Sequence, residues 1–302
     1  MIAVGLILVI AAALGTLVSV GFRVGEIAGL LAPGNLTVAV RISFVAGLLG
    51  VFVFAVGIVA WVAYRSSSPE RARQGYASIW TILSLVAVAM MISLAVSTPL
   101  IVAQVQATPG QKFILTPSDI VISLVTLDGP LIGLLYLRIV RPGVLSWTEM
   151  GFTTSRFWQR VGVGVLVGVA AFVVAGLAGE GLKLIGVEST QMETFAGVRG
   201  ASVPQFIGVL LAASVIAPVC EETFFRGYIV TAMKRRGRVP IAIIASSGLF
   251  ALSHANLTVF LPILFVGLIF GTAFWRTGSL VPSIVAHGVL NAVGFVAFYV
   301  QP

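Results

Sequence analysis

The chain of 302 residues is 59% hydrophobic, only 9% charged, and carries a net charge of +8. Soluble domains are about 25% charged, so one soluble core of this size cannot enclose all of these apolar side chains. The composition predicts an all-α, polytopic helical membrane protein with eight to nine transmembrane helices. It excludes a transmembrane β-barrel, whose strands are short and alternating. Nucleic acid is not expected as a partner, because the basic residues lie between apolar runs, as membrane orientation requires.

The apolar runs are long enough to be assigned to individual spans, since about 20 apolar residues cross a bilayer as a helix. We expect nine candidate spans, at residues 2–22, 40–64, 76–104, 118–138, 161–187, 204–233, 239–256, 258–275 and 280–300. The break between the seventh and eighth rests only on the string HANLT and Pro262, which leaves eight spans as the alternative. The first run lacks the basic region of a secretory signal, so we interpret it as a retained span.

The loops between the spans predict an orientation and a location. With nine spans the N-terminus is expected on the cytoplasmic side, because this orientation gives the cytoplasmic loops an excess of Lys and Arg. The composition, rich in Ala, Val, Gly and Arg, is typical of a GC-rich prokaryotic gene, so we expect a prokaryotic cell membrane. We divide the chain into about four N-terminal spans at 1–145 and a C-terminal helical bundle at 146–302, and no oligomeric state is predicted.

Two aspartates are the main charged residues within the first four spans. Asp119 follows Pro117 and Ser118 and is predicted near a helix start, where its charge meets the positive end of the helix dipole. Asp128 lies deeper in the same span, and a position at a helix end does not explain it.

Two adjacent glutamates, Glu221 and Glu222, lie in the apolar string PVCEETFFRGY. An ionised carboxylate in hydrocarbon costs several kcal/mol, so such residues are usually functional. Arg226 follows Glu222 at i,i+4 and is expected to pair with it and keep it ionised, while Glu221 points about 100° away. The alternative is a buried ion pair that only stabilises packing, for which one glutamate would suffice. Cys220 is expected to flank the same cavity as a small core residue.

Both histidines of the chain and an asparagine lie in the last predicted spans. His254 ends the string FALSH, and His287 and Asn291 are i,i+4 in HGVLN. A core histidine or an interhelical hydrogen bond of about 1 kcal/mol is the structural alternative. At 1.5 Å per residue the two glutamates lie ~18–20 Å, and His287 with Asn291 ~10–17 Å, from the same face. These depths overlap, whereas His254 is expected in the far half of its span.

These residue types suit two kinds of hydrolysis. A carboxylate with a nearby histidine activates water as a general base, and a second histidine with an asparagine donates hydrogen bonds to the oxyanion. Peptide hydrolysis then needs no covalent intermediate. The same groups suit a divalent metal, because two histidines and a glutamate form a known zinc set with a second carboxylate as base. The residues alone leave both alternatives open.

The strings EETFFR, FALSH and HGVLN resemble the three signatures of the CAAX-protease and bacteriocin-processing (CPBP, or Abi) family of intramembrane endopeptidases. These signatures are Glu-Glu-x-x-x-Arg, Phe-x-x-x-His and His-x-x-x-Asn/Asp, and all three occur in order within residues 205–298. Other intramembrane protease classes are not supported, because HExxH, Gly-x-Ser-Gly and Gly-x-Gly-Asp are absent from the sequence.

The resemblance implies an intramembrane glutamic endopeptidase that uses no cofactor, although family members were long called metalloproteases and zinc is the alternative. It also implies a role for each motif residue: Glu221 as the water-activating base with His254, His287 and Asn291 as the oxyanion site, and Glu222 with Arg226 as support. In eukaryotic relatives the substrate is a prenylated C-terminal CAAX segment. The implied partners are therefore the lipid bilayer and a peptide or prenylated-protein substrate.

Three functional hypotheses follow from these residues. The first is an endopeptidase acting on a lipidated or membrane-associated substrate; in a prokaryote, peptide maturation, bacteriocin immunity and regulation are equally open roles. The second is a non-catalytic scaffold or immunity protein of the same fold. The third is an ion-coupled transporter that uses Glu221, Glu222 and Arg226 as a relay, but the uneven distribution of polar residues speaks against the inverted repeat typical of transporters.

Overall fold

The computed structural model describes residues 53, 56–107 (main chain only at 98–107), 114–187, 195–234, 239–254 and 256–300. The described part of the chain is helical and contains no strand, as the sequence predicts. A helix over 56–66 comes first. The elements that follow are α4 (Pro69–Arg73), α5 (Ile79–Ala107), α6 (Pro117–Leu135), η2 (Tyr136–Val140), α7 (Phe157–Leu184), η3 (Ala196–Val198), α9 (Val203–Leu211), η4 (Ala212–Ile216), α10 (Ala217–Glu222), η5 (Thr223–Val230), α11 (Thr231–Lys234), α12 (Val239–Ser253), η6 (Leu257–Val259), α13 (Phe260–Thr277) and α14 (Leu280–Tyr299).

Six helices of the described residues are long and apolar enough to cross a membrane. They are Ile79–Ser97, Pro117–Val140, Phe157–Leu184, Val203–Lys234, Leu257–Thr277 and Leu280–Tyr299. The protein is therefore an integral membrane protein, but eight to nine spans are not confirmed. The expected span at 2–22 and most of that at 40–64 lie outside the described residues.

The seventh expected span, 239–256, is α12, which ends at Ser253 and is separated from α13. The predicted break after it is confirmed, and His254 lies in that break. With 15 residues, α12 is about 22 Å long, shorter than the hydrocarbon core of about 30 Å. It therefore ends before it could cross a bilayer perpendicular to its plane.

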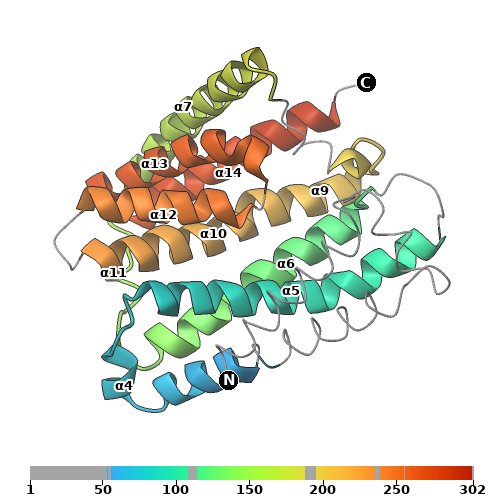
Figure 1. Cartoon of the computed structure of the whole chain (residues 1–302). Coiled ribbons are helices and arrows are strands. Elements are labelled where there is room, and N and C mark those ends of the chain that lie inside the picture. The colour runs from blue at the N-terminus through green and yellow to red at the C-terminus, as the bar shows by residue number, and fades with distance from the viewer. Residues whose placement is uncertain are drawn as a thin grey trace.

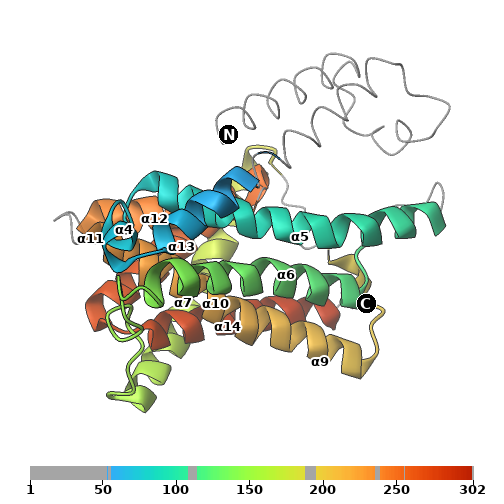
Figure 2. The ribbon, with the colours of Figure 1, turned by 90° about the horizontal axis from the view of Figure 1, so that it is seen from below.

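The helices form a bundle in which α6 is central (Figures 1 and 2). It contacts α5 on one side and α9 and α10 on the other, and both views show it between them. On the C-terminal side α14 packs along α7, and α13 contacts both α12 and α7. This arrangement brings α10, α12, α13 and α14, which carry the motif residues, into one part of the bundle.

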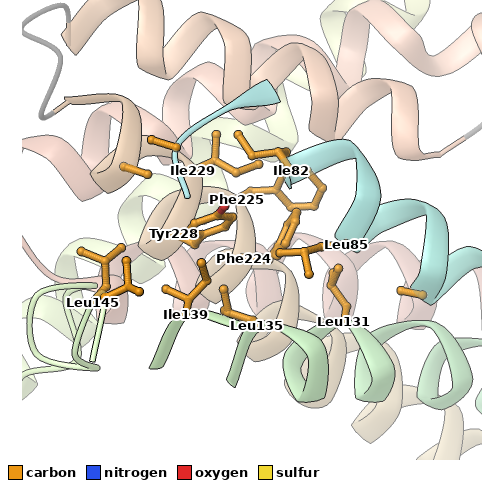
Figure 3. Close-up of a cluster of buried hydrophobic side chains, with 14 of the residues drawn as sticks. Ile82, Leu85, Leu131, Leu135, Ile139, Leu145, Phe224, Phe225, Tyr228 and Ile229 are labelled. Carbon is orange, nitrogen blue, oxygen red and sulfur yellow. The ribbon is translucent and has the colours of Figure 1, made fainter. Parts of the chain in front are cut away.

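The largest buried cluster joins the two predicted halves of the chain. Figure 3 shows Phe224 and Tyr228 of η5 facing Leu135 and Ile139 of α6 and η2. The phenol of Tyr228 also donates a hydrogen bond to the carbonyl of Tyr76. The helix that carries the two glutamates is thus held against α6 by its aromatic face. The proposed division at residue 145 stays a prediction.

The start of α6 agrees with the sequence. The Thr116 hydroxyl accepts the Asp119 N–H at 3.2 Å, and the Asp119 carboxylate accepts the Thr116 N–H at 2.9 Å. Pro117 occupies the first turn, where its missing N–H costs nothing. Asp119 therefore caps the helix, as predicted.

The span Val203–Lys234 contains Pro218 and two π-helical stretches, η4 and η5. In η4 the Ala217 N–H donates to the Ala212 carbonyl, five residues back. The next bond of this pattern would need an N–H on residue 218, which proline lacks. The Ala213 carbonyl is therefore left free for a partner outside the helix, and π-helical segments of this kind often occur at functional sites.

Small residues let α14 approach its neighbours closely. A Cβ on Gly288 would lie 2.5 Å from the Ser214 carbonyl oxygen of η4. On α7, a Cβ on Gly164 would lie 2.6 Å from the Val285 Cβ, and one on Gly168 would lie 2.7 Å from the Ala286 carbonyl oxygen. Gly164 and Gly168 form a GxxxG pair of the kind that packs membrane helices. These close contacts set the distance between α14 and its neighbours, and with it how near His287 of α14 comes to α10.

Candidate active site

Glu222, at the end of α10, is fully buried and lies between two partners. Its Oε1 accepts a hydrogen bond from the Arg226 guanidinium at 2.8 Å and contacts His287 Nδ1 at 3.0 Å. The structure therefore contains the i,i+4 pair that the sequence predicts. Its Oε2 has no hydrogen-bond partner among the described residues. Arg226 and His287 therefore share one oxygen of this carboxylate.

Arg226 is also fully buried and is held on three sides. A second nitrogen donates to the Gly267 carbonyl of α13 at 3.1 Å. The guanidinium carbon lies 4.5 Å from the centroid of the Phe250 ring and 5.7 Å from that of Phe270. Cation–π contacts of this kind are stronger when desolvated. Arg226 therefore links its own helix to α12 and α13 as well as balancing the charge of Glu222.

His287 of α14 contacts both glutamates. Because a carboxylate can only accept, Nδ1 carries the proton that is donated to Glu222. Nε2 then points to the other side and lies 3.7 Å from Glu221 Oε2. The ring also packs against Phe250 and Phe270, with centroids 5.6 and 5.5 Å away. Glu222 thus orients the imidazole so that its second nitrogen faces Glu221.

Glu221 is the more accessible of the two glutamates. Its side chain is 17% exposed, whereas that of Glu222 is fully buried. Its one ionic contact among the described residues is the long one to His287. Cys220 beside it is a half-buried free thiol, consistent with the expected position flanking the same site. Of the two carboxylates, Glu221 therefore has the greater exposure and the longer ionic contact.

His254 lies in the turn that follows α12 and is partly exposed. Its Nδ1 is 2.9 Å from the Phe250 carbonyl, four residues back. Because a carbonyl can only accept, Nδ1 carries the proton, and in the neutral ring Nε2 is free to accept one. The Phe250 ring contacts this imidazole, with centroids 5.0 Å apart.

The expected pairing of Glu221 with His254 is not present as a direct contact. Within the described residues no hydrogen bond or ion pair joins them, and His287 lies against Glu221 instead. A difference in depth does not explain the missing contact. Counted along the helices from Lys234 and from Val239, Glu222 lies at about 18 Å and His254 just beyond the end of α12, at about 22 Å. The difference in depth that the sequence suggests is therefore small. The Phe250 ring contacts both imidazoles, with its centroid 5.0 Å from that of His254 and 5.6 Å from that of His287.

Asn291 lies one turn beyond His287 and binds the neighbouring helix. Its amide nitrogen donates to the Ala213 carbonyl at 2.7 Å, the carbonyl that Pro218 leaves free. This is the interhelical hydrogen bond that the sequence analysis kept as the structural alternative. One N–H of the amide remains for another acceptor, so a role at an oxyanion stays a prediction.

A metal site was the other chemical alternative for these residues. Among the residues that the structure describes, no group of three or more His, Cys, Asp and Glu side chains is arranged to hold a metal ion. The use of a metal stays untested.

A family model described as "Type II CAAX prenyl endopeptidase Rce1-like" matches residues 203–293, which include all three motifs. The chain belongs to the Rce1-like family. It is also similar to an uncharacterized 24.3 kDa protein of Escherichia coli, with 32% identity over 176 residues that cover 53% of this chain and 79% of that protein. No solved structure matches. Family membership indicates a protease-type membrane protein, as the motifs predict.

The structure adds groups to the site that sequence reasoning did not single out as functional. Phe250 contacts Arg226, His254 and His287. Its place as the first residue of the Phe-x-x-x-His motif was the available signal. The Gly267 carbonyl and Phe270 of α13 carry no such signal, because their contacts with Arg226 depend on how α13 packs.

Proposed function

We propose that this protein is an intramembrane endopeptidase that hydrolyses a peptide bond of a lipidated, CAAX-type, or membrane-associated substrate. The observation that carries the proposal is the difference between the two glutamates. Glu222 is buried and bound to Arg226 and His287, whereas Glu221 is partly exposed and faces His287 Nε2. One carboxylate therefore supports the site, and the other is available as the base.

In the proposed reaction Glu221 accepts a proton from a water molecule, and the water oxygen attacks the carbonyl carbon of the scissile bond. His254, whose imidazole contacts Phe250, assists Glu221 by accepting a hydrogen bond from the same water at its free Nε2. The carbon–nitrogen bond of the tetrahedral intermediate then breaks. The proton taken from water passes to the leaving nitrogen, so that one water yields one carboxyl and one amine.

The negative charge of the tetrahedral intermediate needs hydrogen-bond donors. Protonated His287 donates from Nδ1 to Glu222 and offers its Nε2–H to the oxyanion, while Asn291 offers its remaining amide N–H. The proposed mechanism uses no cofactor; zinc is the alternative, and a chelator experiment distinguishes the two.

The test uses the purified full chain in lipid nanodiscs with a farnesylated CAAX peptide and the same peptide without the lipid, and mass spectrometry of the products. We expect Glu221→Gln to lower hydrolysis by on the order of 10²–10⁴-fold without loss of folding. Glu180→Gln is the matched control, because Glu180 is an exposed glutamate of α7 paired with Lys183. Unchanged hydrolysis by the Glu221 variant would refute the proposed base. No product from the wild-type chain with either peptide would favour the scaffold or immunity hypothesis.

A further inference from the structure

Asp128 of α6 is a buried carboxyl near the two glutamates. It is only 1% exposed, and neither carboxylate oxygen has a hydrogen-bond partner among the described residues. An ionised carboxylate without partners in an apolar interior is strongly disfavoured. A neutral carboxyl in the same place carries a hydrogen that it can donate. The burial therefore favours a protonated Asp128.

Two titratable groups, Cys220 and Glu221, lie across the contact between α6 and α10. Asp128 is close enough to Cys220 and Glu221 for their charges to interact. Both ribbon views show α6 alongside the helix that carries these residues (Figures 1 and 2), and α6 contacts α10 and η5. Asp128 lies outside residues 203–293 matched by the family model.

The charges around this point do not balance if every carboxyl is ionised. Arg226 is bound to Glu222 at 2.8 Å, and the described part of the structure gives it no ion pair with Glu221 or Asp128. His287 is shared between the two glutamates. Like charges in a low dielectric repel each other strongly, and a proton kept on one of the two carboxyls, Asp128 or Glu221, would relieve that repulsion.

We propose that Asp128 is a positioning residue for Glu221. In this arrangement Asp128 keeps the proton and donates its O–H hydrogen bond to Glu221 through one water. The pair then carries a single negative charge, and that charge is on the carboxylate that is partly exposed. This inference rests on the proposed role of Glu221 as base, but its first consequence, the protonated carboxyl, does not depend on activity.

The first experiment measures that proton without substrate. Infrared difference spectra between the wild-type chain and Asp128→Asn, recorded in nanodiscs at neutral pH, should contain the C=O band of a protonated carboxyl that shifts in D₂O. Asp119→Asn is the matched control, since Asp119 is a half-buried aspartate of the same helix whose carboxylate accepts capping hydrogen bonds from Thr116. The band should persist, at a shifted frequency, in Glu221→Gln. The proposal would be overturned if Asp128→Asn loses no such band, or if only Glu221→Gln loses one.

The second experiment uses peptide hydrolysis and two substitutions of the same residue. Asp128→Asn keeps a neutral donor and should retain kcat/KM within about tenfold, whereas Asp128→Leu removes the donor and should lower kcat by about 10- to 100-fold. The alkaline limb of the pH profile, where the pair loses its shared proton, should move to higher pH in Asp128→Asn. Equal losses in both variants with an unchanged pH profile, or full activity of Asp128→Leu, would overturn the assignment.

The two experiments separate this inference from the proposed function. A wild-type chain that hydrolyses neither peptide counts against the endopeptidase and leaves the infrared result to decide the protonation of Asp128. A wild-type chain that hydrolyses peptide, with no carboxyl band assigned to Asp128, counts against this inference alone.

Discussion

Replacement of Arg226 by methionine is the most direct test of how the site is held together. The change keeps an unbranched side chain of similar length but removes the guanidinium from Glu222, which lies 2.8 Å away and is fully buried. Breaking a buried ion pair from one side costs about 3–5 kcal/mol, because the remaining charge has lost its partner. The Gly267 carbonyl also loses its donor at 3.1 Å, which adds about 1 kcal/mol.

Because typical unfolding free energies are about 5–15 kcal/mol, Arg226→Met should remove a large part of the stability. Glu222→Gln removes the charge of the partner but keeps an oxygen acceptor. In the double variant neither unpaired charge remains, so its loss of stability should be smaller than the sum of the single losses by about 2 kcal/mol. Arg276→Met is the control. Arg276 is exposed and its guanidinium lies over the Trp275 ring, so its replacement should change the unfolding free energy by at most about 0.5 kcal/mol.

Unfolding can be followed by circular dichroism during titration of detergent micelles with sodium dodecyl sulfate. A stabilising role of the ion pair is refuted if Arg226→Met lowers the unfolding free energy by less than about 1 kcal/mol, or if the losses of the two single variants add up to that of the double variant within about 0.5 kcal/mol. Either result would mean that the pair contributes little to folding, and that the charge of Glu222 is balanced by another group.

Three further outcomes follow from the packing and the chemistry. Gly168→Ala should destabilise the bundle by about 1–3 kcal/mol, because the added Cβ would lie 2.7 Å from the Ala286 carbonyl oxygen. The control Gly176→Ala, whose Cβ would have nothing within 4 Å, should be neutral in the same unfolding titration. Equal effects of the two substitutions would contradict the packing of α7 on α14. Gly267→Ala should cost a similar about 1–3 kcal/mol, because its Cβ would lie 2.9 Å from Ser247 Cβ, and an unchanged unfolding midpoint would argue against the close approach of α13 to α12. Strong chelators should leave peptide hydrolysis intact, measured by product formation before and after dialysis, and activity that is lost and then restored by zinc would instead support the metal alternative.

Much of the secondary structure could be predicted from the sequence because it depends on neighbouring residues. The expected spans at 118–138 and 280–300 correspond to helices at Pro117–Val140 and Leu280–Tyr299. The cap of Asp119 and the pair of Glu222 with Arg226 were also predictable, since residues three or four apart share a face of a helix. The π-helical stretches were not predicted, although Pro218 was visible as a residue that cannot complete the backbone pattern.

The sequence by itself determined that both glutamates lie in one membrane helix, that Arg226 binds Glu222, and that Glu221 faces another direction. These facts follow from the geometry of a single helix. Only the tertiary structure decided that His287 contacts both glutamates, because that contact depends on the rotation and approach of α14, which Gly288 permits at the Ser214 carbonyl. Spacing along the chain places residues in depth, but packing between helices decides which of them meet.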